Sequence, residues 1–487
     1  MKQLSTATSS NFTYLNRLPQ QRQNKLLGAF WVISLGLIFY EIFWTKTDSF
    51  LSNLGAILIT IAALLPSYLW CSGRAQGLPI FPFFAITFIW SYALPLVSNF
   101  TKIIDYSPSS HLFAGQTVAA FLTLGSLVWF QFVKLSPQYP KYYRILTSKI
   151  RNQFFLVILL LSVFFNAANV GGWLTFLDAG LFSVITGATL ALTALSSFIL
   201  AYRLGSFELS KLQGRLFIVL LLSYIVINSI SLLLVSATGA FITATAAFII
   251  GRKKIPILPV VILLVFISLL HYGKGEMRSK YWFSEYKTYV QPWEYPSFYA
   301  EWIGHSIDIL NRQDTLPKSK RSESFIERSS IIQMLMLAQD KSPNTKPFLY
   351  GKTYEILPQL LIPRFLNNNK IRSAEGTHML SIYYGLQTYK NTLTTSISWG
   401  LLAESYANFG LFGFAGLAVF VGSFCGAITH WSINAPILSA QFLLAVLMMT
   451  YALQNEWTAG VYLVSMFQSG VLLFAMSLFL MKTYRLY

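Results

Sequence analysis

The chain contains little cysteine or histidine, and this shortage bears on whether it has a disulfide framework or a zinc site. Among 487 residues there are 2 cysteines and 5 histidines, and Cys71 and Cys425 lie in or beside apolar runs with no nearby histidine or acidic ligand set. The sequence therefore implies neither a disulfide framework nor a zinc site. Heptads, short-period repeats and low-complexity tracts are absent as well, and the two halves show no evident inverted repeat.

Charge is scarce too. Only 11% of residues are charged, 54% are hydrophobic and 16% are aromatic. A water-soluble domain of this length could not cover so much apolar material with polar surface, so lipid must be the solvent. The net charge of +18 would indicate nucleic acid in a soluble protein. In a membrane protein the position of the charges matters more than their sum, and we expect no nucleic-acid partner.

Long apolar runs predict an all-α polytopic membrane protein with about twelve transmembrane helices. Each run is long enough, or nearly so, to cross about 30 Å of hydrocarbon at 1.5 Å per residue. The third run contains three prolines, and the eighth is short enough to be re-entrant. The predicted spans are 26–44, 51–71, 78–98, 112–133, 154–173, 181–202, 216–235, 238–251, 257–271, 407–428, 435–454 and 458–481.

Basic residues alternate from loop to loop, which predicts the orientation. With the N-terminus inside, the inner short segments carry nearly all of the positive charge and the outer ones are slightly acidic, as the positive-inside rule requires. The first span follows a basic segment without a small-residue cleavage site and is expected to be uncleaved. We thus expect cytoplasmic termini, helices one to nine in 1–271, an extracytoplasmic loop at 272–395, and helices ten to twelve in 396–487.

The predicted loop carries 16 lysines and arginines against 11 acids, and it opens with aromatic residues in ten of the 22 positions from 281 to 302. Such rings either stack on sugars or anchor the loop at the lipid headgroups. Ser324 and Glu327 then form a capping box that predicts a helix of about four turns. Arg328 in its first turn opposes the helix dipole, which leaves two roles open, a salt bridge to a neighbouring acid or an anion ligand.

Four cations follow close together in the sequence, set among proline, glycine and asparagine: Lys352, Arg364, Lys370 and Arg372. A loop of this composition is able to converge on a polyanion at the membrane surface. A solvated basic loop and a contact with anionic lipid remain the alternatives.

The second half of this loop resembles the bacterial oligosaccharide repeat-unit polymerases, the Wzy-type O-antigen and exopolysaccharide polymerases, which are related to the O-antigen ligases. The resemblance covers the stretch 351–410 and rests on the order of four short elements. These are Gly351-Lys-Thr-Tyr354, Ile362-Pro-Arg364 with Lys370, Tyr384-Gly385, and the Glu404-x-Tyr-x-Asn-Phe-Gly410 stretch that enters a span. One element departs from the family pattern, because Thr238 stands where a middle-span turn often carries an arginine; Arg328 or Lys274 is a candidate replacement.

The resemblance implies a glycosyltransferase that moves a growing glycan from polyprenyl diphosphate to a sugar hydroxyl of a second lipid-linked repeat unit. It implies no metal and no cofactor, a location in the bacterial inner membrane, and a flippase and a chain-length regulator as partners. Arg364 is then the lead residue for the diphosphate, with Arg328, Lys352, Lys370, Arg372 and Tyr384 as further substrate contacts.

The acceptor hydroxyl needs a proton acceptor, and two residues are candidates. Glu404 lies near the mouth of a span, where partial desolvation makes a carboxylate more basic, and the imidazole of His378 titrates near neutrality. Both side chains also have ordinary structural interpretations, a salt bridge for the acid and simple exposure for the histidine. Three rival functions remain: a transporter or flippase for lipid-linked oligosaccharide, an O-antigen ligase, and an inactive subunit of a secretion complex.

Overall fold

The structure is a computed structural model that describes residues 5–6, 13–15, 19–45, 47, 49–134, 142–146, 152–232, 234–282, 289–312, 325–362, 367, 370–393 and 395–485. The chain divides into two compact units. The first comprises Met1–Ile145, Ser329–Gly470 and Thr483–Tyr487, and the second comprises Leu146–Arg328 and Val471–Lys482. The predicted loop is therefore shared, with residues up to Arg328 in the second unit and the rest in the first.

Helices make up most of the first unit. Ser49 caps the second of them by accepting the backbone N–H of Ser52, and Pro79 directly precedes the third. They are α1 (Gln20–Phe43), α2 (Phe50–Cys71), α3 (Ile80–Phe88), the π-helix η2 (Ile89–Ala93), α4 (Leu94–Leu96), α5 (Pro108–Lys134), α13 (Ile332–Lys341), α14 (Lys352–Glu355), α15 (Leu357–Leu361), α16 (Glu375–Tyr383), α17 (Tyr389–Thr392), α18 (Gly400–Ser432) and α19 (Ala440–Tyr451).

The second unit is helical as well. Asp178 caps α7, and Ser210 with Gln213 forms a capping box at the start of α8. Its helices are α6 (Asn152–Val170), α7 (Ala179–Gly205), α8 (Lys211–Ile230), α9 (Leu234–Arg252), α10 (Ile257–Tyr281), the 3-10 turn η3 (Pro292–Glu294) and α11 (Tyr295–Arg312). The boundary between the units falls within α12 (Phe325–Ser329), α20 (Ala459–Leu480), β2 (Tyr142–Leu146) and β3 (Met481–Arg485). With β1 (Ser5–Thr6), these strands form a small sheet of order β1-β3-β2.

Nine helices in the described part of the chain are long and apolar enough to cross a membrane, which fits a polytopic membrane protein. They are α1, α2, α5, α6, α7 from Gly180, α8, α10, α18 and α20. The three other predicted runs also form helices that lie outside this group: the interrupted segment Ile80–Leu96, α9, and the short α19. The predicted all-helical membrane architecture is confirmed at this level.

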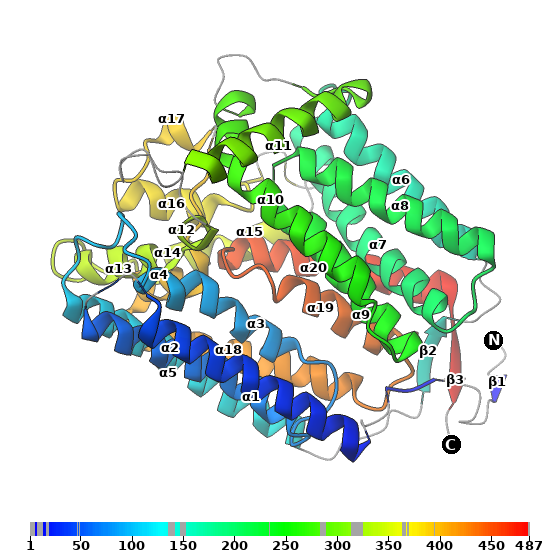
Figure 1. The fold of residues 1–487 in the computed structure, drawn as a ribbon, viewed down its shortest axis with the longest axis horizontal. Helices are drawn as coiled ribbons and strands as arrows, with labels where there is room; N and C mark the ends of the chain where they lie inside the picture. The colour runs from blue at the N-terminus through cyan, green and yellow to red at the C-terminus, as the bar shows by residue number, and fades with distance from the viewer. Residues whose placement is uncertain are drawn as a thin grey trace. The chain divides into compact units, whose positions relative to one another are not determined.

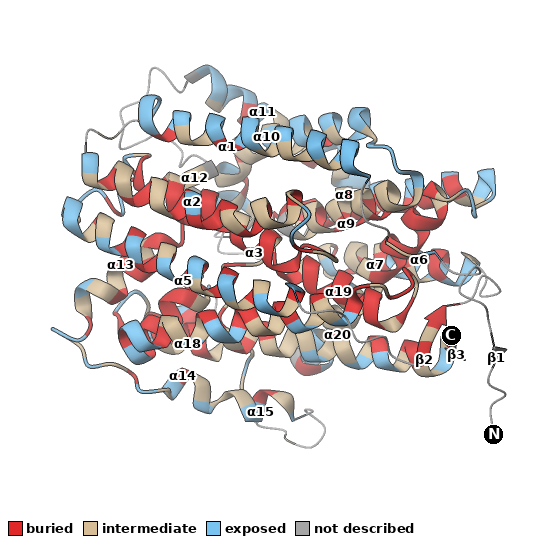
Figure 2. Ribbon diagram, turned by 90° about the horizontal axis from the view of Figure 1, so that it is seen from below, coloured by how far each residue is buried: buried red, intermediate tan, exposed pale blue. Residues whose placement is uncertain are grey.

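Small residues let the helices of the first unit approach closely. A Cβ added to Gly115 of α5 would lie 2.6 Å from the Cα of Gly55 in α2, and one added to Gly422 of α18 would lie 2.6 Å from the carbonyl oxygen of Gly125 in α5. The helices α2 and α5 accordingly lie side by side (Figure 1). Figure 2 shows the buried residues on α2 and α3, whereas α1 buries only Ser34 and Glu41.

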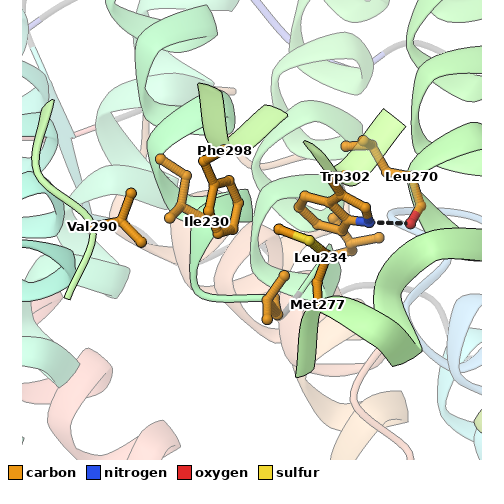
Figure 3. Packing of buried hydrophobic residues seen from close by; sticks show 8 residues of the cluster. Ile230, Leu234, Leu270, Met277, Val290, Phe298 and Trp302 are labelled. Carbon is orange, nitrogen blue, oxygen red and sulfur yellow. Dashed lines mark hydrogen bonds between the residues drawn. The ribbon is translucent and has the colours of Figure 1, made fainter. Parts of the chain in front are cut away.

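The second unit has a hydrophobic core cluster to which α8, α9, α10 and α11 contribute, drawn in Figure 3. Phe298 and Trp302 are fully or almost fully buried, and the indole N–H of Trp302 donates to the carbonyl of Leu270 at 2.7 Å. The Tyr299 hydroxyl donates to the carbonyl of Val226 at 2.6 Å. The inner rings of the aromatic segment therefore pack the fold, while Trp282 and Trp293 stay 45% and 74% exposed.

The differences from the sequence prediction are largest at the ends of α10 and α18 and between α12 and α13. Helix α10 continues to Tyr281, ten residues past the predicted end, and α18 begins at Gly400, seven residues before the predicted start. The four-turn helix predicted after Ser324 is wrong, because α12 ends at Ser329 and α13 begins at Ile332. Its break follows from a tertiary bond, since the backbone N–H of Ile331 donates to the carbonyl of Ser91 in the π-helix at 2.9 Å. Ser324 lies outside the described residues.

Candidate functional site

Helix α18 is broken at Gly410, where φ is 57° and ψ is −136°. This conformation favours glycine, and a Cβ there would also lie 2.8 Å from the ring of Phe348. The chain folds back sharply at this point, because a Cβ on Gly413 would lie 2.1 Å from the carbonyl oxygen of Ser405. The part after the break, residues 411–432, is still long enough to cross about 30 Å of hydrocarbon. Glu404 therefore lies in a short helix ahead of that part.

The break leaves two helix carbonyls to accept bonds from another segment. In an unbroken helix, the carbonyls of Ala407 and Asn408 would each accept the backbone N–H of the residue four positions later. Here they accept the backbone N–H groups of Leu349 and Tyr350, each at 3.0 Å. The Gly351–Tyr354 segment is thus docked against the Glu404–Gly410 segment, although the two are far apart in the sequence.

Asn408 ties the two segments together through its side chain. Its Oδ1 accepts the backbone N–H of Gly351 at 3.1 Å, and its Nδ2 donates to Thr353 Oγ1 and to the carbonyl of Glu404, each at 2.8 Å. Asn408 and Thr353 are completely buried. The ring of Tyr354 also stacks on Phe409, with 6.1 Å between centroids. Two elements that the sequence analysis noted separately form one packed site.

Glu404 lies at the centre of this site and is completely buried. Its Oε2 accepts the backbone N–H of Ala459 at 2.7 Å, at the first residue of α20, where the helix dipole favours negative charge. Its Oε1 has no hydrogen-bond partner among the residues that the structure describes. The Thr353 hydroxyl faces the same carboxyl group without a hydrogen bond of ordinary geometry to Oε1. One carboxyl oxygen is thus anchored at Ala459, and the Thr353 hydroxyl lies next to the same carboxyl group.

His378 lies in α16, two residues after Gly376, and is 7% exposed. Burial lowers the pKa of His378 below its ordinary value; the charge of Glu375 opposes this shift and that of Arg372 adds to it. The imidazole Nδ1 is 3.8 Å from Glu375 Oε2. At neutral pH the ring is therefore neutral and able to accept a proton.

Two tyrosines of the motifs have different surroundings. Burial, and then the charge of Glu404, raises the pKa of the Tyr354 phenol well above its ordinary value, so this hydroxyl stays protonated beside the carboxyl group. The hydroxyl of Tyr384 is paired with Ser342 Oγ at 2.8 Å, and its ring lies 5.1 Å from that of Trp399. Tyr384, predicted to contact substrate, is 7% exposed in this structure and packs within the fold.

The structure describes three of the predicted cationic ligands. Lys352 begins α14 and is exposed, Lys370 is partly buried, and Arg372 is exposed one turn before α16. Arg372 is close enough to His378 for its positive charge to lower the pKa of that imidazole. The lead residue, Arg364, lies outside the described residues, and so does the side chain of Arg328.

The segment that departs from the family pattern is helical here. Thr238 lies in α9, and its hydroxyl donates to the carbonyl of Leu234 at 2.6 Å. The sequence analysis did not single out Arg278, whose guanidinium contacts the turn before α9. One of its N–H groups donates to the carbonyl of Leu232 at 3.0 Å, and the guanidinium lies 4.2 Å from the ring of Trp282. Arg278 lies one helical turn after Lys274, which was named as a candidate, and this spacing could have indicated it.

Within the described residues, no group of three or more histidine, cysteine or acidic side chains is arranged to hold a metal ion. Comparison with known proteins adds no relative: no protein-family model matches the chain, and neither a curated protein nor a solved structure matches it.

Proposed function

We propose that this chain is a glycan polymerase that transfers a growing oligosaccharide from polyprenyl diphosphate to a sugar hydroxyl of a second lipid-linked repeat unit. The observation that carries the proposal is the docking of Gly351–Tyr354 on Glu404–Gly410 around a buried carboxyl group with one unpartnered oxygen. These segments are two of the four elements on which the resemblance to Wzy-type polymerases rests. Because the two segments pack together, they support the proposal that both belong to one active site.

In the proposed reaction, the carboxylate of Glu404 accepts the proton of the acceptor hydroxyl as the O–H bond breaks. The acceptor oxygen forms a bond to the anomeric carbon of the donor, and the bond from that carbon to the diphosphate oxygen breaks. The electron pair of that bond leaves with the polyprenyl diphosphate. His378, neutral at physiological pH, is the alternative proton acceptor.

Cations next to the leaving diphosphate lower the barrier, because negative charge grows there in the transition state. Arg364 is proposed for this role since arginine binds phosphate oxygens bidentately. Arg328, Lys352, Lys370 and Arg372 are proposed to surround it, and Arg372 supports this by lying beside His378. The proposed transfer is independent of metal ions and cofactors, as the resemblance implies.

The proposed topology has about twelve spans, cytoplasmic termini, and the segment 272–395 on the outer face of a bacterial inner membrane. The nine long apolar helices among the described residues and the alternation of basic loops support it. Both lipid-linked substrates then approach laterally through the bilayer. A flippase that supplies the repeat unit and a chain-length regulator are the proposed partners.

A transporter would instead require functional charges near the bilayer midplane. The buried Glu41 accepts a hydrogen bond from Thr60, but it lies only two residues before the end of α1 and thus away from the helix centre. The polymerase is therefore the better supported function.

A paired substitution tests the role of the carboxyl group. Glu404→Gln keeps the shape and an anchor for Ala459 but removes the base, so we expect short glycans with normal protein levels. Glu355→Gln changes an exposed acid in α14 and should leave chain length normal. The readout is the glycan size ladder from membranes of the two strains. A normal ladder from Glu404→Gln would remove Glu404 as the base.

A further inference from the structure

The segment that leads into α20, residues 455–460, lies outside the stretch on which the resemblance rests, yet it contacts the start of α18. The carbonyl of Glu456 accepts the backbone N–H of Gly400, the first residue of α18, at 3.0 Å. The backbone N–H of Ala459 donates to Glu404 Oε2 at 2.7 Å. The segment 455–460 therefore holds Glu404 both by its carboxyl group and by the beginning of its helix.

A buried pair of hydroxyl groups joins the segment 455–460 to α16. The hydroxyl oxygens of Thr458 and Thr377 lie 2.9 Å apart, and both side chains are almost completely buried. Thr377 directly precedes His378 in α16. A buried and paired hydrogen bond makes the segments that it joins more rigid. This bond therefore restrains the distance between α16 and the segment that holds Glu404.

Gly460 brings the backbone before α16 against the same segment. A Cβ on Gly460 would lie 2.8 Å from the carbonyl oxygen of Ser373, so the close approach of the two backbones requires glycine. Ser373 directly follows Arg372, one of the cations proposed to surround the leaving diphosphate. One short segment thus contacts the carboxyl group of Glu404 on one side and the stretch 372–378 on the other.

We propose that the segment 455–460 sets the separation between Glu404 and the stretch 372–378, and that Thr458 is its main positioning residue. The inference rests on the polymerase function proposed above, in which Glu404 accepts the proton of the acceptor hydroxyl and Arg372 lies near the leaving diphosphate. One bond forms and another breaks at the same anomeric carbon, so the two groups must keep a fixed distance. Thr458 acts on the reaction through its neighbours and not by touching substrate.

Replacing both hydroxyls by methyl groups tests this separation. In the double variant Thr377→Val with Thr458→Val, no buried hydroxyl of the pair is left without its partner, so the protein should fold. Methyl carbons pack at about 3.5–4.0 Å, whereas the hydroxyl oxygens are 2.9 Å apart, so the segments should separate by up to about 1 Å. A displacement of this size costs roughly a hundredfold in the rate of polymerisation. Serine at both positions keeps the hydroxyl pair and should restore the wild-type rate.

Thr429→Val is the matched control for the loss of a buried threonine hydroxyl. Thr429 is completely buried in α18, and its hydroxyl donates to the carbonyl of Leu78, which is distant in the sequence. This variant should melt at a lower temperature but polymerise at the wild-type rate. A wild-type rate in the double valine variant would overturn the proposal, and so would an equal loss of rate in Thr429→Val.

An infrared measurement on purified protein separates the positioning role from the polymerase function. The carboxyl band of Glu404, assigned by subtracting the spectrum of Glu404→Gln, reports the hydrogen bond from Ala459. This band should shift in the double valine variant and stay in place in the double serine variant and in Thr429→Val. An unshifted band in the double valine variant overturns the positioning role. A shifted band in a protein whose wild type does not polymerise retains that role and removes the polymerase.

Discussion

Replacing Asn408 by alanine should undock the Gly351–Tyr354 segment. The side chain makes two bonds across the segments, from Gly351 N–H to Oδ1 at 3.1 Å and from Nδ2 to Thr353 Oγ1 at 2.8 Å. Both Asn408 and Thr353 are completely buried, so water does not replace the lost partners unless the segment opens. The substitution should therefore act on stability and on the site together.

The expected magnitude follows from these contacts. A buried hydrogen bond contributes about 1 kcal/mol net, and a buried polar group left without a partner costs about 1–3 kcal/mol. For two such bonds the free energy of unfolding should fall by about 3 kcal/mol, roughly a hundredfold in the folding equilibrium. The isosteric Asn408→Asp should be no less harmful. It keeps the acceptor for Gly351 but loses the donor and adds a charge beside Glu404.

Thermal unfolding in detergent and limited trypsin digestion at Lys352 measure the two effects. Asn408→Ala should melt well below the wild type and be cut faster at Lys352. Asn311→Ala, at an exposed position of α11, should stay within about 0.5 kcal/mol of the wild type. An Asn408→Ala protein that melts and resists trypsin like the wild type would refute the docking that the structure shows.

Three further substitutions probe the same region. Gly410→Ala should lower the melting temperature through about 1–3 kcal/mol of backbone strain and a collision with Phe348; a wild-type melting curve would contradict the break in α18. Tyr384→Phe removes the hydroxyl paired with Ser342 and should cost about 1 kcal/mol of stability while glycan chains stay long, whereas short chains from stable protein would make Tyr384 a substrate contact. The lowered pKa of His378 means that the unfolded chain binds a proton near pH 6.5 before the folded chain does, so stability should fall as the pH drops through that value. His378→Gln should flatten this dependence in melting curves recorded between pH 7.5 and 5.5, and an unchanged slope would show that His378 is not responsible for it.

The helices were predictable because crossing lipid demands long apolar runs, and all twelve predicted runs coincide with helices. Helix ends were less predictable. Polar residues continue α10 to Tyr281, because packing against α11 stabilises a helix beyond its apolar part. The break between α12 and α13 depends on a bond from Ile331 to Ser91, which is distant in the sequence, and local capping signals do not contain such information.

The site was predictable only in part. Glu404 and the Gly351–Tyr354 segment were recognised from their order in the chain, but their contact depends on the non-helical backbone at Gly410, which no local sequence pattern indicated. Thr353 and Asn408 lay within the recognised motifs, but no role was predicted for either, because a short buried polar side chain gives no periodic signal. The aromatic segment was ambiguous because rings such as Trp302 and Trp293 look alike in a sequence and differ only in burial.

The polymerase function is tested most directly with purified protein in vesicles that contain a polyprenyl-diphosphate-linked repeat unit. Free polyprenyl diphosphate and the glycan size distribution are measured together over time. The proposed function requires the released carrier to increase as chains lengthen, and requires both signals to be lost in Glu404→Gln. Unchanged lipid-linked oligosaccharide redistributed across the vesicle membrane, with no carrier released, would contradict a polymerase and identify a transporter.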